Sequence, residues 1–412
     1  MTPLSFAIAV LLAASHARAA IGDEAWKAIT TGDHAKAKSL CQAPADAGDG
    51  FCQAIIGTLW LNGQGVAKDY GMAERWFRKS ADQGDPHGQN GLGWLHQNGW
   101  GVKQDYAEAA RLYRKAAEQG EYFSESGLGW LYVNGWGVKQ DYAEAMKWLK
   151  KAAERGNPSG EHGVGWLYYN GWGVNKDYTE TAKWWRKAAE KGNADCQQGL
   201  GTLYMNAWGV PKDYAEAFKW FKKSADQGNH WGENGLAGLY FWGWGVKQDD
   251  AETARLWRLS DEGGNPYASN GLGYLYRTGR SVAKDPAQAL KWFRKGIGLG
   301  DLAFCTVNLG GMYENGEGLT QDYVEAYKWY LIGAAHDGPG SREGIERLKA
   351  LMTKEQIAEA QKLAASSESS SHGQAAAPVP SSPSPAPSSV SPVDAPTYKR
   401  AERPNDFALV VG

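Results

Sequence analysis

Residues 127–156 read GLGWLYVNGWGVKQDYAEAMKWLKKAAERG, and this pattern returns along most of the chain. Its middle, Gly135-Trp136-Gly137-Val138, recurs in steps of 36 residues. The other copies of this block begin at Gly63, Gly99, Gly171, Ala207, Gly243, Gly279 and, one residue late, Gly316. A fixed period of this length is typical of repeat proteins, so the eight copies are interpreted before any single motif.

Each copy predicts two helices joined by a glycine loop. The first helix carries two internal glycines, Gly127 and Gly129 in this copy. Glycine inside a helix costs about 1 kcal/mol relative to alanine, so its return in copy after copy indicates a close backbone approach between neighbouring helices. The second helix begins with a capping box, Asp141 and Glu144, and ends at Gly156.

The second helix has one apolar stripe, formed by Ala145, Trp148, Leu149 and Ala152 at helical spacing. A single pair of helices cannot bury such a stripe alone, so each pair must stack on the next. The sequence therefore predicts an all-α fold, an α/α superhelical solenoid of helix-pair repeats.

The full pattern, Gly-x-Gly-x-Leu-Tyr-x-Asn-Gly-x-Gly-Val followed by the capped second helix, resembles the Sel1-like repeat, a relative of the tetratricopeptide repeat. The resemblance covers residues 51–339, with a partial repeat or cap over residues 20–50 and two capping helices over residues 340–365. It implies a right-handed superhelix with the first helix of each pair on the concave side. Proteins of this family serve as scaffolds and adaptors, in bacteria often in the envelope or secreted.

The two ends of the chain differ from the repeats. An apolar run from Leu4 to Ala14, followed by Ala17-Arg18-Ala19, predicts a signal peptide over residues 1–19 and a periplasmic or secreted protein. The alternative is an ordinary buried first helix. Later in the chain no apolar run reaches the ~20 residues of a membrane span.

The C-terminal segment is rich in serine, proline and alanine. Residues 366–404 are predicted to be a disordered linker, because their apolar content is too low to offset the entropy of ordering. Residues 405–412 form an apolar tail, and Phe407–Gly412 is similar to the opening strand of caspase-like peptidase domains. Either this tail starts a truncated domain, or it is a frayed apolar end.

The composition argues against several function classes. Lys and Arg total 44 against 46 Asp and Glu, and this near-neutral balance is unlike that of a nucleic-acid-binding protein. The histidines show no metal-ligand spacing, and no glycine loop follows a strand to hold phosphate. We therefore expect a protein that is not an enzyme, with no cofactor and no metal. The histidines considered are His34, His87, His96, His162, His230 and His336.

The cysteines fall into two groups. Cys52, Cys196 and Cys305 share one position of the first helix, where other copies carry glycine or serine, so they are expected to be buried packing residues. Cys41 lies on the preceding helix. We predict a Cys41–Cys52 disulfide that holds the N-terminal cap, consistent with an oxidising compartment.

One face of the first helices varies from copy to copy, as a binding surface is expected to vary. We predict an exposed aromatic strip on this concave face, including Trp94, Trp130 and Trp166. The predicted partner-binding residues are Asn90, Trp94, Gln97, Trp130, His162, Trp166, Tyr169, Phe241, Tyr274 and Arg277.

The loop tryptophans form a second candidate surface, at a position where flanking copies carry Gln64, Arg280 and Glu317. They either pack on the loops of neighbouring repeats or form a stacking platform for a sugar or an extended peptide. This ladder consists of Trp100, Trp136, Trp172, Trp208 and Trp244.

These patterns favour a non-catalytic scaffold that binds a protein or peptide partner along the concave groove in the bacterial envelope. One alternative is a module that binds polysaccharide or peptidoglycan through the tryptophan ladder. The other is the N-terminal adaptor region of a truncated caspase-like peptidase.

Overall fold

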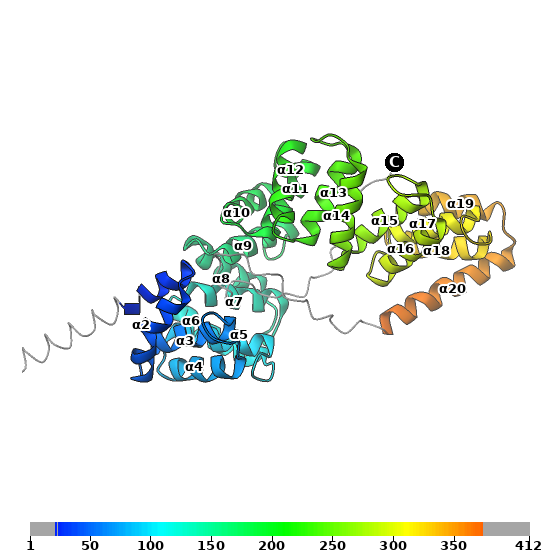
Figure 1. The fold of residues 1–412 in the computed structure, drawn as a ribbon. Coiled ribbons are helices and arrows are strands. Elements are labelled where there is room, and N and C mark those ends of the chain that lie inside the picture. The colour runs from blue at the N-terminus through cyan, green and yellow to red at the C-terminus, as the bar shows by residue number, and fades with distance from the viewer. Residues whose placement is uncertain (1–20, 23, 374–412) are drawn as a thin grey trace, which may run out of the picture. The chain divides into compact units, whose positions relative to one another are not determined.

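The computed structural model describes residues 21, 22 and 24–373, and helices connected by short loops make up this part of the chain, with no strand in it (Figure 1). The all-α helix-pair architecture is confirmed. The predicted signal peptide, residues 374–404 of the linker and the apolar tail at residues 405–412 lie outside the described residues. None of the described helices is both long and apolar enough to cross a bilayer.

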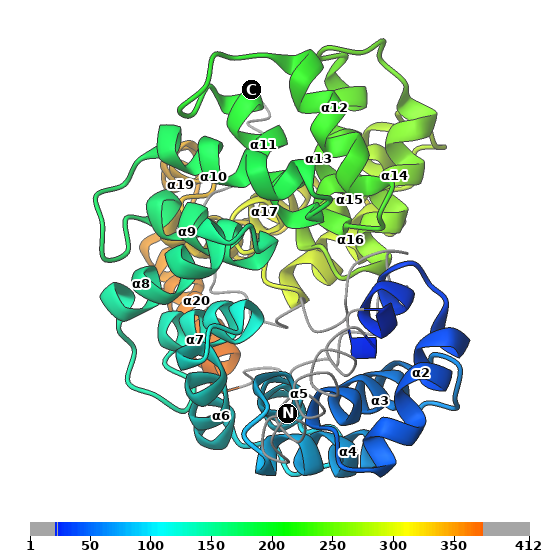
Figure 2. The same ribbon diagram turned by 90° about the vertical axis from the view of Figure 1, so that its left-hand side faces the viewer.

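The helices fall into two units, the first ending at Asn193 and the second beginning at Ala194. The helices of the first unit are α2 (His34–Asp46), α3 (Gly50–Asn62), α4 (Tyr70–Asp82), α5 (Pro86–Asn98), α6 (Tyr106–Glu118), α7 (Tyr122–Asn134), α8 (Tyr142–Glu154), α9 (Pro158–Asn170) and α10 (Tyr178–Glu190). Within this unit successive helices pack on one another, as Figure 2 shows for α2 to α7.

The second unit continues the same alternation and ends in two further helices. Its helices are α11 (Ala194–Asn206), α12 (Tyr214–Ala225), α13 (His230–Trp242), α14 (Asp250–Glu262), α15 (Pro266–Thr278), α16 (Pro286–Gly298), α17 (Phe304–Asn315), α18 (Tyr323–Ala335), α19 (Ser341–Lys349) and α20 (Lys354–Gly373). We call the odd-numbered helices α3 to α17 the A helices and the even-numbered helices α4 to α18 the B helices.

The predicted helix boundaries follow from caps that repeat in each copy. In the third repeat the Asp141 side chain accepts hydrogen bonds from the backbone N–H groups of Ala143 and Glu144. The A helix before it ends at Gly135, whose φ of 68° is left-handed and favours glycine. Glu144 pairs with Lys147 one turn along, with 3.1 Å between the ammonium nitrogen and the carboxylate oxygen.

The glycines inside the A helices allow one large B-helix side chain to lie between two helix backbones. A Cβ atom on Gly201 would lie 2.6 Å from the Phe221 ring, and one on Gly235, in the next A helix, 2.5 Å from it. Phe77 lies between Gly57 and Gly91 in the same way. We call this arrangement the glycine clamp, and it confirms the predicted close approach of the helices.

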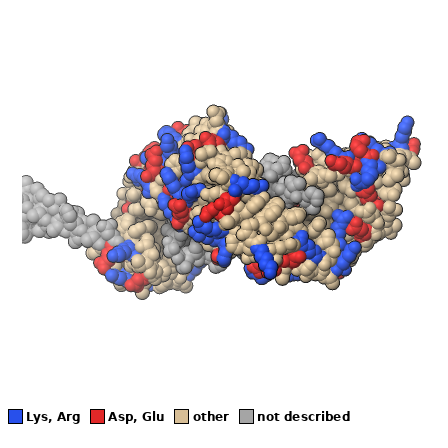
Figure 3. Space-filling view, turned by 90° about the horizontal axis from the view of Figure 1, so that it is seen from above, with Lys and Arg blue, Asp and Glu red and all other residues tan. Residues whose placement is uncertain are grey.

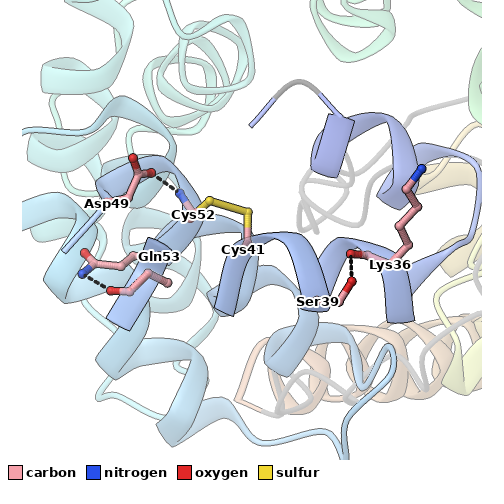
Figure 4. Close-up of a disulfide and its surroundings, with 7 residues drawn as sticks. Lys36, Ser39, Cys41, Asp49, Cys52 and Gln53 are labelled. Carbon is pink, nitrogen blue, oxygen red and sulfur yellow. Dashed lines mark hydrogen bonds between the residues drawn. A yellow bond between two sulfur atoms is a disulfide. The ribbon is translucent and has the colours of Figure 1, made fainter. Parts of the chain in front are cut away.

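The N-terminal cap is joined to the first repeat by the predicted cysteine pair. The structure contains a Cys41–Cys52 disulfide between α2 and α3, with 4.9 Å between the two Cα atoms (Figure 4). Beside it the Gln53 side-chain amide donates a 3.0 Å hydrogen bond to the carbonyl of Ala45. The cap therefore has a covalent and a polar link to α3.

At the other end, α19 takes the place that the next A helix has in the other repeats. A Cβ atom on its Gly344 would lie 2.6 Å from the Tyr330 ring, so Tyr330 lies between Gly310 and Gly344 in a last glycine clamp. The Tyr330 hydroxyl and the Arg347 guanidinium both donate to the Glu314 carboxylate, at 2.7 Å each. The hydrogen bond from Arg347 holds the pKa of Glu314 below its usual range.

The last helix is longer than the sequence indicates, because α20 continues through the serines that we assigned to the linker and ends at Gly373. The Ser366 and Ser367 hydroxyls donate to the carbonyl of Leu363 at 2.9 Å, so these polar side chains are satisfied within the helix. The linker was predicted to begin at residue 366, but the described residues 366–373 are helical, so this boundary is wrong.

Replacing Glu314 by Gln is expected to lower the free energy of unfolding by about 1 kcal/mol at pH 7. A carboxyl group whose pKa is lower in the folded state stabilises the fold above its unfolded pKa of ~4.3, and this contribution is lost as pH falls through the folded value. The difference between Glu314→Gln and the parent should therefore shrink as the pH is lowered below the unfolded value of ~4.3. Urea unfolding at several pH values measures it.

Glu346→Gln is the matched control, because Glu346 pairs with Lys349 while 71% of its side chain is exposed. Its effect should stay within about 0.5 kcal/mol at every pH. A Glu314 variant that behaves like the Glu346 variant would contradict the proposed role of this ion pair in the cap.

Candidate binding surfaces

The face of the A helices that we predicted to be an exposed groove is largely buried. Trp94, Trp130 and Trp166 are 6%, 4% and 8% exposed. The predicted exposed aromatic strip is therefore wrong. Two of the ten predicted partner-binding residues, Tyr274 and Arg277, are half-buried. The other eight are buried: Asn90, Trp94, Gln97, Trp130, His162, Trp166, Tyr169 and Phe241.

These side chains are covered because A helices of successive repeats contact each other, as α3 does α5 and α7 does α9. Trp94 meets the Trp100 ring edge to face, with 4.5 Å between the ring centroids. Trp166 stacks at 5.8 Å on Tyr169 of the same helix. The close approach that the glycines permit uses this face for packing between repeats.

The polar members of this face have partners within the repeat or in the next one. The Ser124 hydroxyl donates to Asn90 Oδ1 of the preceding repeat at 2.9 Å. The Tyr113 hydroxyl donates to Gln97 Oε1, also at 2.9 Å. Arg277 donates to the Glu317 carboxylate at 2.7 Å. The residues of this face therefore vary between copies because the side chains that they pack against vary. This variation alone does not indicate a surface that binds another molecule.

The loop tryptophans stack on the tyrosine that opens the B helix of the preceding repeat. The ring centroids lie 5.0 Å apart for Tyr70 and Trp100, and 5.0 Å apart for Tyr214 and Trp244. The pairs Tyr106–Trp136 and Tyr142–Trp172 are alike, at 5.2 Å each. Trp208, the fifth, is half-buried like the others. This stacking accounts for four of the tryptophans as contacts between repeats.

One degenerate copy replaces this aromatic pair by an ion pair. Asp250 stands where other B helices open with tyrosine, and Arg280 stands where other loops carry tryptophan. Their side chains lie 2.6 Å apart, and the hydrogen bond from Arg280 lowers the pKa of Asp250. The two positions therefore change together because they form one contact.

The sequence analysis missed two rows of aromatic side chains at the N-terminal ends of the A helices. In the first unit the ring centroid of His87 lies 4.9 Å from that of Phe51 and 6.2 Å from that of Trp26, which precedes α2 and joins this row from outside the A helices. In the second unit the Tyr267 ring lies 5.8 Å from Trp231 and 6.1 Å from Phe304. We call these the N-terminal aromatic rows; their members are half-buried, except for the buried Phe304.

The signal for these rows is present in the sequence. Phe51 and His87 are the second residues of α3 and α5, and Trp231 and Tyr267 are the second residues of α13 and α15. Comparing this one position across the copies would have found them.

The described residues include two kinds of side chain that often act in catalysis, metal ligands and cysteines. No group of three or more His, Cys, Asp or Glu side chains in this part of the chain could hold a metal ion. Cys196 and Cys305 are buried cysteines outside the disulfide, and burial raises the pKa of Cys305 well above its usual value, so its nucleophilic thiolate is disfavoured. On the face shown in Figure 3, acidic and basic side chains are interspersed.

Comparison with known proteins agrees with this geometry. The family model described as Sel1 repeat matches residues 51–85, 86–121, 124–157, 158–193, 194–229, 232–260, 266–301 and 303–337. The chain belongs to the Sel1 repeat family. Proteins built of this repeat are generally scaffolds for protein interactions without catalytic activity. The search of curated proteins found no match.

Two solved structures of similar proteins support the assignment to the Sel1 repeat family. A protective antigen present in uropathogenic Escherichia coli strains, with an SLR fold, is 34% identical over 80% of this chain and 71% of its own, with a TM-score of 0.59. A Sel1 repeat protein from Oxalobacter formigenes is 31% identical over 60% of this chain and 99% of its own, with a TM-score of 0.53.

The exchange of Tyr–Trp for Asp–Arg predicts energetic coupling between the two positions. Tyr214→Asp and Trp244→Arg should each lower the free energy of unfolding by about 1–2 kcal/mol, because each breaks the stack. The double variant, which copies Asp250 and Arg280, should lose about 1 kcal/mol less than the sum of the two. A double-mutant cycle in urea measures this coupling, and strict additivity would contradict the direct contact.

Proposed function

We propose that this Sel1 repeat protein is a non-catalytic scaffold of the bacterial envelope that binds an extended segment of another protein across the N-terminal aromatic row of its second unit. The observation that carries this proposal is the row Trp231–Tyr267–Phe304. Its rings follow one another at 5.8 and 6.1 Å along three successive A helices, and Trp231 and Tyr267 are half-buried while Phe304 is buried beside Tyr267.

Aromatic side chains at this spacing suit a protein partner. Large rings that are partly covered by their neighbours lose little conformational entropy on binding and provide much of the apolar contact area of protein interfaces. Each row crosses consecutive repeats, so an extended segment would contact several A helices at once.

The envelope location rests on two observations. The predicted signal peptide at residues 1–19 indicates export. The Cys41–Cys52 disulfide fits an oxidising compartment, because cytosolic thiols are kept reduced.

Site-specific photocrosslinking in the full chain tests the proposal. A benzophenone amino acid in place of Tyr267 should give a discrete protein adduct in intact cells, whereas the same probe in place of Lys291, an exposed residue of α16, should not. With the captured protein purified, Tyr267→Ala should weaken its binding by about tenfold and Lys291→Ala should leave it unchanged.

Several results would overturn the proposal. Equal adducts at both positions, or an affinity unaffected by Tyr267→Ala, would show that the row is not the binding surface. Adducts to glycan in place of protein would favour the polysaccharide alternative. Circular dichroism of each variant checks that the helical content is retained.

A further inference from the structure

A polar pair with a buried A-helix member connects the two helices of several repeats. The fourth residue of the A helix bonds to a residue thirty positions later, just after the B helix. Gln83 donates to Gln53 at 2.7 Å, and Gln227 donates to Gln197 at 2.7 Å. Gln119 and Gln89 form the same contact at 3.0 Å. The buried glutamine of the A helix thus has its hydrogen-bond partner just after the B helix of the same repeat.

Where this fourth residue of the A helix is a glutamate, a lysine in the B helix or just after it pairs with the carboxylate. Glu125, which is fully buried, pairs with Lys151 at 2.9 Å. Glu161, which is 2% exposed, pairs with Lys191 at 2.7 Å. A buried carboxylate is unfavourable unless it is paired, so these lysines compensate the charge.

The sixth repeat has the buried glutamate but neither lysine. Glu233 is 5% exposed. The position of Lys151 is taken by Leu259, and the position of Lys191 by Gly263. A Cβ atom on Gly263 would lie 1.9 Å from the His230 ring, so His230 occupies the space of the absent side chain. Its Nδ1 lies 3.0 Å from Glu233 Oε2.

A cavity of about 190 Å³ lies at this position, between α12, α13 and α14, and Glu233 forms part of its lining. Two cations also line it, but each already has a carboxylate partner. Lys222 pairs with Asp226 at 2.9 Å. Arg255 lies close enough to Glu233 to feel its charge, and its Nε and Nη2 atoms bond to Glu252, at 2.8 and 2.6 Å.

The lining therefore has three carboxylates against two cations, with His230 as the nearest partner of Glu233. An imidazole compensates the charge of a carboxylate only while it is protonated, whereas a lysine ammonium does so throughout the neutral pH range. Leucine side chains form the apolar part of the wall, where the methylene stem of a long cationic side chain could lie. They are Leu236, Leu256 and Leu259.

We propose that this cavity binds a primary ammonium group, namely a lysine side chain of the protein partner, whose nitrogen pairs with Glu233 as Lys151 and Lys191 pair with the equivalent glutamates. The identity of the donor as a partner protein rests on the proposed scaffold function. The cavity is smaller than the roughly 300 Å³ at which small-molecule pockets begin, so it suits one side chain rather than a metabolite.

The probe for this site is Nα-acetyl-lysine amide, added to the full chain and followed by methyl NMR signals of Leu236 and Leu256. Nα-acetyl-norleucine amide is the control ligand, because it has nearly the same shape without the charge. The lysine probe should bind at least tenfold more tightly than the norleucine probe. Equal binding of the two would overturn the proposal.

Three variants complete the test. Glu233→Gln copies Gln197 of the preceding repeat, and Leu259→Lys copies Lys223, so both suit the repeat fold. Each should weaken binding of the lysine probe at least tenfold. Leu259→Met, which changes this wall without adding charge, should retain it. Binding unaffected by Glu233→Gln would show that the carboxylate is not the site.

Thermal unfolding gives a second readout that needs no ligand. Leu259→Lys should raise the melting temperature by a few degrees, because its ammonium compensates Glu233, and Leu259→Met should not. An unchanged or lower melting temperature for Leu259→Lys would contradict the inference that Glu233 lacks a cation. Since neither test uses the partner protein, a failure here is separate from a failure of the crosslinking experiment.

Discussion

The packing of one large B-helix side chain against two glycines is the contact on which the Sel1 repeats of this protein depend. Each such side chain touches the A helix of its own repeat and that of the next, as Phe221 does with Gly201 and Gly235. The two glycines of a clamp together cost about 2 kcal/mol relative to alanine, and burying the aromatic side chain between them stabilises by about 2–3 kcal/mol. The packing therefore offsets the cost of both glycines, and they are kept where the helices approach and the repeats stack.

This close approach also determines where a partner can bind. Helices at this separation bury the side chains that face along the stack, and Trp94, Trp130 and Trp166 become packing residues. The two proposed binding sites lie elsewhere, at the N-terminal ends of the A helices and at a place where one copy lacks a residue that other copies have. The cavity beside Glu233 is such a place, because Leu259 and Gly263 remove both lysine positions. The sites that we propose in this chain therefore lie at departures from the repeat rather than at its shared positions.

The sequence predicted the helix pairs, their caps and the close approach at the glycines, because comparison of copies within one chain shows which positions the architecture requires. It also paired Cys41 with Cys52, which the structure joins. The prediction of an exposed groove was wrong because periodicity tells which side of a helix a residue occupies. It does not tell how close the neighbouring helix lies. The pairs thirty residues apart, such as Gln53 with Gln83, were missed although a comparison of copies would have revealed them. The length of α20 was missed because serine-rich composition favours a linker in the absence of contacts.

The most direct test of the account is the sign of the stability change in two glycine-to-alanine variants of the second unit. Gly235 lies inside α13, where a Cβ would meet the Phe221 ring at 2.5 Å, whereas a Cβ on Gly298, in α16, would have no neighbour within 4 Å. In urea unfolding, Gly235→Ala should lower the free energy of unfolding by about 1–3 kcal/mol through overpacking. Gly298→Ala should leave it unchanged or raise it by up to about 1 kcal/mol. A Gly235→Ala protein as stable as the parent, or more so, would contradict the glycine clamp.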